Sequence, residues 1–243
     1  MHESEYRAMF ELEDRLWWYT GMRAITATLL GRVGQIDTVL DVGCGTGYSM
    51  NWLKHTFEPR QVFGVDLSKH AAALWKEGSI DSAVIASAEL LPFEAGRFDL
   101  VTCFDVVYQL DSQGVEAALG EINRVLKPGG LLFIREPAYD WLRGSHDVIV
   151  ATHQRFTLSR LRRVLMARGF APRRMTYANT LLFPLAVAHR LASGMKKDGG
   201  SDVKEVAPAI NRVFAGVLGL EARLLRVFRF PFGLSTVAVA EKR

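Results

Sequence analysis

A glycine-rich stretch, DVGCGTG, offers the clearest chemistry in this sequence. Gly43, Gly45 and Gly47 alternate with other residues at the end of an apolar run. Glycine permits the tight turns and close backbone approach that a ligand-binding loop needs between a strand and a helix. Asp66 ends the next apolar run, about twenty residues further on, where a carboxylate binds the ribose hydroxyls of a nucleoside. The spacing therefore indicates a nucleoside-binding loop.

Asp41, two residues before the first glycine, narrows the kind of nucleoside. A carboxylate at this place repels a pyrophosphate but binds a cationic amine, directly or through water. The glycine spacing is GxGxG, whereas dinucleotide-binding proteins have GxGxxG. S-adenosylmethionine (SAM) is a nucleoside with a cationic amino-acid tail, and we expect it as the cofactor. An NAD(P)-dependent oxidoreductase is the competing enzyme class.

The elements that position these residues alternate between strands and helices. Apolar runs predict strands at residues 37–43, 61–68, 82–89, 97–107, 131–137, 172–178 and 235–242. Helical patterns lie at residues 48–57, 69–78, 115–127 and 157–170. This alternation predicts an α/β fold with a doubly wound parallel sheet, which binds ligands at the carboxyl ends of its strands.

Four motifs follow one another between residues 37 and 137: VLDVGCGTG, VFGVDLS, AELLPFEAGRFDLVTCFDVV and EINRVLKPGGLLFIREP. Through these motifs the chain resembles the class I SAM-dependent methyltransferases, especially the branch that acts on small molecules. The resemblance implies a Rossmann-like, seven-stranded, mostly parallel sheet whose last strand is antiparallel. It also implies S-adenosyl-L-methionine as the cofactor.

The same resemblance assigns residues to parts of the cofactor. Those near the methionine end are Asp41, Gly43, Gly45 and Gly47, with Cys44 in the same loop. Those near the ribose and adenine are Asp66, Leu67, Ala88 and Glu89, and Phe104 is near the sulfonium. The chain departs from the family at Ser87, where an acid is common, and at Tyr108-Gln109, where Glu-His is common. The usual base is therefore absent, and Tyr108 takes its place among the candidate catalytic residues.

The N-terminal segment contains an unusual WWY sequence. Residues 5–30 have apolar residues at helical spacing, and Gly21 is predicted to divide them into two helices. Trp18 is a candidate cofactor-binding residue because aromatic faces attract cations such as a sulfonium. Arg23 is a second candidate, facing the cofactor's carboxylate. The alternative is that the tryptophans only anchor the segment to the sheet.

The loop after the fifth predicted strand holds candidate general bases. Methyl transfer from a sulfonium depends mainly on alignment and exclusion of water, and it needs a base only when the accepting atom carries a proton. His146 with Asp147, or His153, is predicted to supply that base, because histidine titrates near neutral pH. This hypothesis favours an oxygen over a nitrogen acceptor. Exposed polar residues without a catalytic role are the alternative, and no metal site is expected.

Residues 179–234 form an insertion of mostly helical character between the last two predicted strands. Its second half is a basic amphipathic pattern, which suits a helix that covers the sheet, contacts a partner or lies on a membrane surface. Residues 179–192 are nearly all apolar, which favours a substrate lid, a dimer contact or a hydrophobic substrate.

Composition limits the remaining possibilities. The 243 residues carry a net charge of +4, too dilute to indicate nucleic-acid binding, and include two cysteines. The charged N-terminus lacks a signal-peptide core and no apolar run is long enough to span a membrane, so we expect a cytoplasmic protein. We expect one domain, divided into an N-terminal helical lid (1–36), a SAM-binding core (37–137), a substrate segment (138–178), the insertion (179–234) and a final strand (235–243).

The sequence thus predicts a methyltransferase that methylates an oxygen or nitrogen of a small molecule. A sugar, a lipid-linked compound or a natural product would suit, and the acceptor is expected to be hydrophobic or glycosylated. A SAM-binding protein with a regulatory, non-catalytic role is the alternative from another class.

Overall fold

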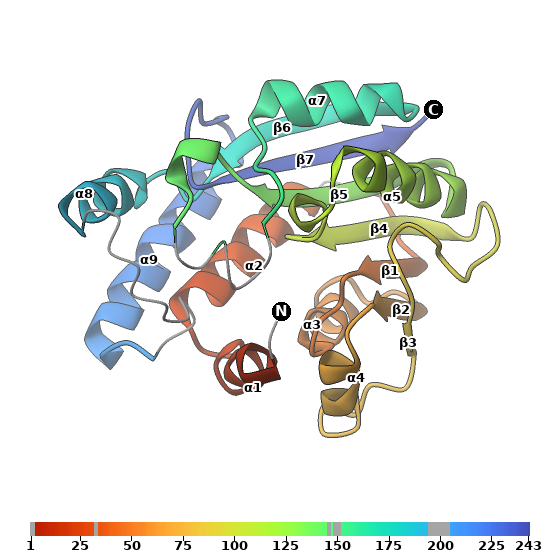
Figure 1. Cartoon of the computed structure of the whole chain (residues 1–243), viewed down its shortest axis with the longest axis horizontal. Helices are drawn as coiled ribbons and strands as arrows, with labels where there is room; N and C mark the ends of the chain where they lie inside the picture. The colour runs from red at the N-terminus through yellow and green to blue at the C-terminus, as the bar shows by residue number, and fades with distance from the viewer. Residues whose placement is uncertain (1–2, 32–33, 145–146, 148–151, 194–204) are drawn as a thin grey trace.

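The computed structural model describes residues 3–31, 34–144, 147, 152–193 and 205–243. Its strands are β1 (Thr38–Val42), β2 (Gln61–Asp66), β3 (Ala83–Ile85), β4 (Phe98–Phe104), β5 (Leu126–Pro137), β6 (Phe170–Ala178) and β7 (Ser235–Lys242). They form one seven-stranded sheet of order β3-β2-β1-β4-β5-β7-β6 (Figure 1). Neighbours from β3 to β5 are parallel, and β7 is antiparallel to β5 and β6. The predicted Rossmann-like fold with an antiparallel last strand is confirmed.

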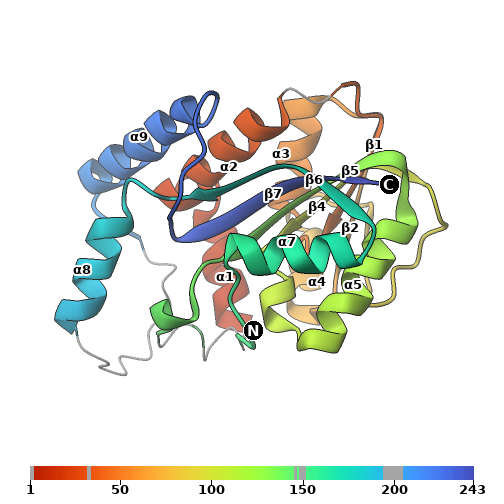
Figure 2. The same cartoon turned by 90° about the horizontal axis from the view of Figure 1, so that it is seen from above.

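Helices cover both faces of this sheet. They are α1 (Glu3–Leu12), α2 (Trp17–Leu30), α3 (Tyr48–Phe57), α4 (Lys69–Trp75), α5 (Ser112–Val125), α7 (Leu158–Ala167), α8 (Phe183–Ser193) and α9 (Pro208–Leu224), with the 3₁₀ turns η1 (Val107–Gln109) and η2 (Asp140–Leu142). Seen from above, α2, α3 and α9 lie on one face, and α5 and α7 on the other (Figure 2). The central strands are mainly apolar because both of their faces are buried.

The alternation of side chains along each strand divides the core in two. In β1, Val39 packs with α2 and α3, while its neighbours Leu40 and Val42 pack with α5 on the opposite face. In β5, Phe133 and Ile134 separate in the same way. The result is a rigid layer whose carboxyl-terminal edge carries the loops of the site.

β3 and β5 differ most from their predicted bounds. β3 is confined to Ala83–Ile85, and the predicted strand continues past it only as far as Ala86, whose N–H donates to the Asp66 carbonyl of β2. β5 begins before the Pro-Gly-Gly sequence, and its register with β4 shifts from Phe98↔Leu126 to Leu100↔Leu131. The expected break at that sequence is therefore a bulge inside the strand, where Gly129 adopts a φ of +74°.

The prediction that Gly21 divides the N-terminal helices is wrong. The break falls between Leu12 and Trp17, and Gly21 lies inside α2. A Cβ atom on Gly21 would stand 2.4 Å from Leu218 Cδ1 of α9, so glycine here permits close packing of the two helices. The true break is held by Arg23, whose guanidinium donates to the carbonyl oxygens of Glu13 and Asp14 at 2.6 and 3.0 Å.

The insertion supplies α8 and α9, and α9 packs along α2. Trp17 and Phe214 meet edge to face at 5.1 Å, and Leu218 is fully buried. The interpretation of α9 as a cover for the sheet is thus supported, although Val213 of α9 and Phe228 beyond its end are 61% and 58% exposed. No helix in the described part of the chain is long and apolar enough to cross a membrane.

Candidate active site

A cavity of about 1740 Å³ opens at the carboxyl ends of the parallel strands. The glycine loop and the ends of β2, β4 and β5 line its floor, and α1, α2, α8 and α9 supply its walls. This is the edge at which doubly wound sheets bind ligands. Its size exceeds the range of about 300–1,000 Å³ typical of one drug-sized ligand. The cavity has room for two molecules side by side.

The glycine loop has the backbone conformation that its sequence predicts. Gly43, Gly45 and Gly47 all have positive φ, at +75°, +53° and +89°. A Cβ atom on Gly43 would stand 2.2 Å from Val106 Cγ2, so a larger residue would also clash with the segment after β4. The loop leads into the N-terminus of α3, where the Tyr48 N–H donates to the Thr46 hydroxyl and the Met50 N–H donates to the Gly47 carbonyl. Gly43 and Gly45 line the cavity, while Gly47 packs against Ile80.

Asp66 links the glycine loop to the end of β2. Its two carboxylate oxygens accept hydrogen bonds from the N–H groups of Gly45 at 2.9 Å and Ser68 at 2.8 Å. Burial raises the pKa of this carboxyl group, and the two N–H donors oppose the rise. Asp66 lines the cavity beside Leu67, which is 71% exposed and so presents an apolar face to a ligand. Both residues line the cavity, and their contacts with the ribose and adenine stay a prediction.

Asp41 lies behind the loop. It is fully buried, does not line the cavity, and accepts hydrogen bonds from the hydroxyls of Ser49 and Thr102, the latter at 2.7 Å. Burial raises its pKa to about 6. Ser49, which does line the cavity, separates Asp41 from a ligand. A direct contact between Asp41 and a cofactor amine therefore has no path in this geometry.

Cys44 lines the cavity, but its side chain is buried. Its side chain packs against Gly64, and burial raises the pKa of its thiol strongly, so the group is a neutral packing element. The neighbouring carbonyl of Gly45 accepts a hydrogen bond from Trp75 Nε1 at 2.8 Å. These contacts fix the loop without using its ligand-facing side.

Ala88 and Glu89, which were predicted to lie near the adenine, line the cavity. The Ser87 hydroxyl, which stands where the family often has an acid, lies 3.3 Å from Glu89 Oε2 and also accepts from the Glu89 N–H at 3.2 Å. Gly114 leaves space for this carboxylate, since a Cβ there would stand 2.7 Å from Glu89 Oε1. Glu89 is thus held at the cavity by its own turn.

Arg135, an arginine that was not predicted as a site residue, also lines the cavity. The guanidinium carbon of Arg135 lies 4.8 Å from the ring centre of Trp18 and 5.1 Å from that of Phe104. Arg135 also forms an ion pair with Asp105, which follows β4 and has a φ of +56°. Cation–π contacts of this kind fix both aromatic rings at the cavity. The sequence could have pointed to Arg135, because Arg135 and Glu136 are charged residues at the end of a predicted strand, LLFIREP, that is otherwise apolar.

Tyr108 lines the cavity from η1 and is nearly buried. Burial raises the pKa of its phenol well above the usual value, which keeps the hydroxyl protonated at neutral pH. Nearby Glu136 is fully buried and accepts hydrogen bonds from the N–H groups of Val107 and Tyr108 at 3.1 and 3.0 Å. Glu136 therefore fixes η1 from behind.

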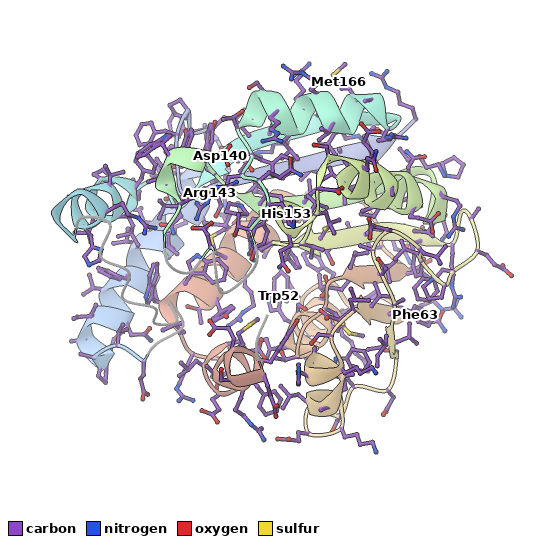
Figure 3. The ribbon with its side chains drawn as sticks, in the orientation of Figure 1. Trp52, Phe63, Asp140, Arg143, His153 and Met166 are labelled. Atoms are coloured by element: carbon purple, nitrogen blue, oxygen red, sulfur yellow. The ribbon has the colours of Figure 1, made fainter. Side chains whose placement is uncertain are left out.

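The predicted bases lie apart from one another. His146 is outside the described residues. Asp147 lines the cavity, but both of its oxygens accept from the Arg155 guanidinium at 3.0 Å. His153 is exposed and does not line the cavity (Figure 3), and its carbonyl accepts from Arg143 at 2.7 Å. The His146–Asp147 pair stays a prediction, and Asp147 serves as a partner of Arg155.

The N-terminal segment closes the other side. Trp18 and Arg23 line the cavity as expected, and the Arg23 guanidinium also lies 4.8 Å from the ring centre of Tyr48. Glu13, which was not predicted as a site residue, lines the cavity near the glycine loop. Its carboxyl group accepts a hydrogen bond from the Thr46 hydroxyl, and burial raises its pKa to about 7.

The far end of the cavity is more apolar. Its walls come from the segment after β5 and from α8 and α9, and they include Leu142, Leu182, Leu185, Ala186, Phe214 and Arg190. Arg190 donates to the Leu142 carbonyl at 2.9 Å. No cluster of three or more metal-ligating side chains occurs among residues that the structure describes.

This strand order, with a glycine loop after β1 and a carboxylate after β2, defines the class I SAM-dependent methyltransferase architecture. A family model described as "Methyltransferase domain" matches residues 40–134. The matched residues lie within the predicted SAM-binding core, and the family that they match implies S-adenosyl-L-methionine as the cofactor.

Relatives with known names cover part of the chain. It is 35% identical over 149 residues to the ubiquinone/menaquinone biosynthesis C-methyltransferase UbiE of Chromobacterium violaceum, an alignment that covers 57% of each protein. It is 31% identical over 137 residues to an uncharacterised protein of Methanocaldococcus jannaschii, which covers 56% of this chain and 51% of that one. The chain spans about half the length of these curated relatives.

Solved structures resemble the chain along nearly its whole length. A protein in complex with the Trm112 methyltransferase activator of Haloferax volcanii has a TM-score of 0.63 at 21% identity, covering 98% of this chain and 93% of that chain. The [4+2]-cyclase SpnF has a TM-score of 0.60 at 20% identity, covering 92% and 80%. These two structures share one fold but are named for different activities, so activity must be argued from the site.

Proposed function

We propose that this protein transfers a methyl group from SAM to an oxygen or nitrogen atom of a small molecule. The observation that carries the proposal is the continuity of the cavity, which runs from the glycine loop to the apolar far end. A cofactor bound along Gly45 and Asp66 would direct its sulfonium toward Phe104 and Arg135, where the second space begins. Such an arrangement aligns donor and acceptor and excludes water.

Asp105 supports an oxygen or nitrogen acceptor. It lines the cavity at the end of β4, beside Phe104, and its ion pair with Arg135 holds the carboxylate in place. A carboxylate there can accept a hydrogen bond from a hydroxyl or amine while the methyl group is transferred. The neutral Tyr108 hydroxyl can orient the same acceptor group. His146 and Asp147 remain the alternative base, as predicted from the sequence.

The far end of the cavity supports an acceptor with an apolar body. Leu142, Leu182 and Phe214 supply hydrophobic surface, and Arg190 adds a cation at the rim of α8. A lipid-linked compound or an apolar natural product fits this surface better than a free sugar does. The UbiE relatives are named as C-methyltransferases, so a quinone-like carbon acceptor belongs in the same screen.

The test begins with calorimetric titration of the protein with SAM, S-adenosylhomocysteine (SAH) and NADH. We expect micromolar binding of the first two and none of NADH. Incubation with methyl-labelled SAM and a panel of alkyl phenols, alkyl amines, quinones and glycolipids should then label at least one compound, and mass spectrometry of the product locates the methyl group. Binding of NADH alone would refute the proposal. Tight SAM binding with no labelled product across the panel would favour the non-catalytic alternative.

A further inference from the structure

Glu13 is a buried acid that reaches the glycine loop from the N-terminal segment. It lies just after α1, is only 6% exposed, and lines the cavity together with Gly45 and Thr46. Its carboxyl group accepts a hydrogen bond from the Thr46 hydroxyl, the one side-chain hydrogen bond recorded for it within the described part of the chain. A carboxylate buried in this way normally has a charged partner. The partner that the site implies is a ligand.

The cofactor's ammonium group needs an acidic partner that the loop itself does not offer. Asp41 stands behind Ser49, with both oxygens bonded to hydroxyl groups. Asp66 is committed to the backbone at the ribose position. Glu13 approaches from the opposite side, where Met9 of α1 also covers Gly45.

We propose that Glu13 binds the ammonium group of the cofactor's amino-acid tail, so that the N-terminal segment recognises the methionine end of SAM. This inference rests on the proposed function, because it concerns the same cofactor. It makes Glu13 a specificity residue for cofactors that carry the amino-acid tail, as distinct from nucleosides that lack it.

Arg23 positions Glu13. Its guanidinium donates to the carbonyl oxygens of Glu13 and Asp14, and so fixes the turn between α1 and α2. Its planar face lies against the Tyr48 ring at the start of α3. The turn is therefore braced against the glycine loop before a ligand arrives, which lowers the entropic cost of binding. A direct role of Arg23 at the cofactor's carboxylate is compatible with this position.

The surroundings of Glu13 make its interaction with the ammonium group dependent on pH. Desolvation by burial raises the pKa of Glu13 to about 7. The hydrogen bond from Thr46 and the charge of Arg23 lower this pKa, whereas Asp14 raises it, and Tyr19 of α2 lies close by. An ammonium group binds the ionised carboxylate and not the neutral acid. Cofactor binding near pH 7 should therefore ionise Glu13 and release its proton.

The experiment compares two ligands in wild type and Glu13→Gln by calorimetric titration. SAH carries the amino-acid tail, and 5′-methylthioadenosine has the same nucleoside without it. We expect the substitution to weaken SAH binding about tenfold or more, from the loss of a charge-assisted hydrogen bond. Binding of methylthioadenosine should change less than about twofold, which also shows that the nucleoside site is still folded. Glu11→Gln, an exposed position near the end of α1, is the matched control and should change neither.

Equal loss of both ligands, or no loss of either, would overturn the assignment of Glu13. If the wild-type protein binds neither SAM nor SAH, the proposed function fails instead, and the two failures are distinguishable. Proton release gives a second readout that a purely structural role would not move. SAH titrations at pH 7 in buffers of different ionisation enthalpy should show proton release in wild type and none from this site in Glu13→Gln.

Discussion

The two ends of the cavity differ in whether backbone or side chains form their surface. At the cofactor end, the surface is largely backbone: Gly43 and Gly45, both of positive φ, line it, and Asp66 is fixed there by two N–H donors. At the acceptor end, the surface is side chains brought from the segment after β5, from α8 and from α9. Backbone geometry tolerates few substitutions, whereas a wall of side chains can change one residue at a time. The first end preserves a cofactor and the second can adapt to an acceptor.

The strongest test of the cofactor end is Asp66→Ala. Loss of the carboxylate removes the ribose contact and frees the two N–H groups that shape the loop, so we expect SAH affinity to fall about a hundredfold or more. Calorimetric titration measures it, with exposed Asp81→Ala as the control. An unchanged affinity would show that Asp66 does not contact the ribose. The contrast between the two ends of the cavity would then lose its main support.

A second test separates binding from stability at the same end. Burial raises the pKa of Glu13 from 4.5 to about 7, so in the empty protein this residue favours folding when protonated and loses that advantage as the pH rises through 7. Glu13→Gln should therefore be more stable than wild type by about 2–3 kcal/mol at pH 8.5. The difference should shrink as the pH falls toward 4.5. Urea unfolding without ligand measures it, and a difference independent of pH would contradict the assignment.

The packed interface (seam) between α2 and α9 joins the two ends of the cavity, and Gly21→Ala tests how tightly it is packed. The added Cβ would stand 2.4 Å from Leu218 Cδ1, and overpacking should outweigh the better helix propensity of alanine, giving a net loss of about 1–2 kcal/mol. Gly216→Ala in α9 meets no atom within 4 Å and should be neutral or stabilising. Equal effects of the two substitutions in chemical unfolding would show that the seam is loose.

The smallest expected effect belongs to the acceptor end. His153 is exposed and outside the cavity lining, so His153→Ala should alter turnover less than about twofold, measured as methyl transfer once an acceptor is found. A drop of tenfold or more would mean that the loop carrying His153 moves into the cavity during the reaction. That result would weaken the view of the acceptor end as a fixed wall.

The predictability of each end follows from its construction. The glycine loop and Asp66 could be predicted because each signal lies within one strand–loop–helix unit. The prediction that Gly21 breaks the helix failed because the local sequence does not show that Leu218, nearly two hundred residues later, lies against it. Glu13 and Arg135 were missed for the same reason, since only tertiary packing brings them to the cavity. The expected pairing of Asp147 with His146 overlooked Arg155, which binds that carboxylate.

The position of β7 has a consequence for how this chain completes its sheet. β7 lies between β5 and β6, and within the sheet β6 pairs with β7 alone. Until residues 235–242 are in place, β5 presents an unpaired apolar edge, the kind of surface at which partly folded chains associate. A truncation that removed this strand would therefore split the sheet internally and leave β6 without support. The most sensitive stage of folding should be the interval before the last strand enters.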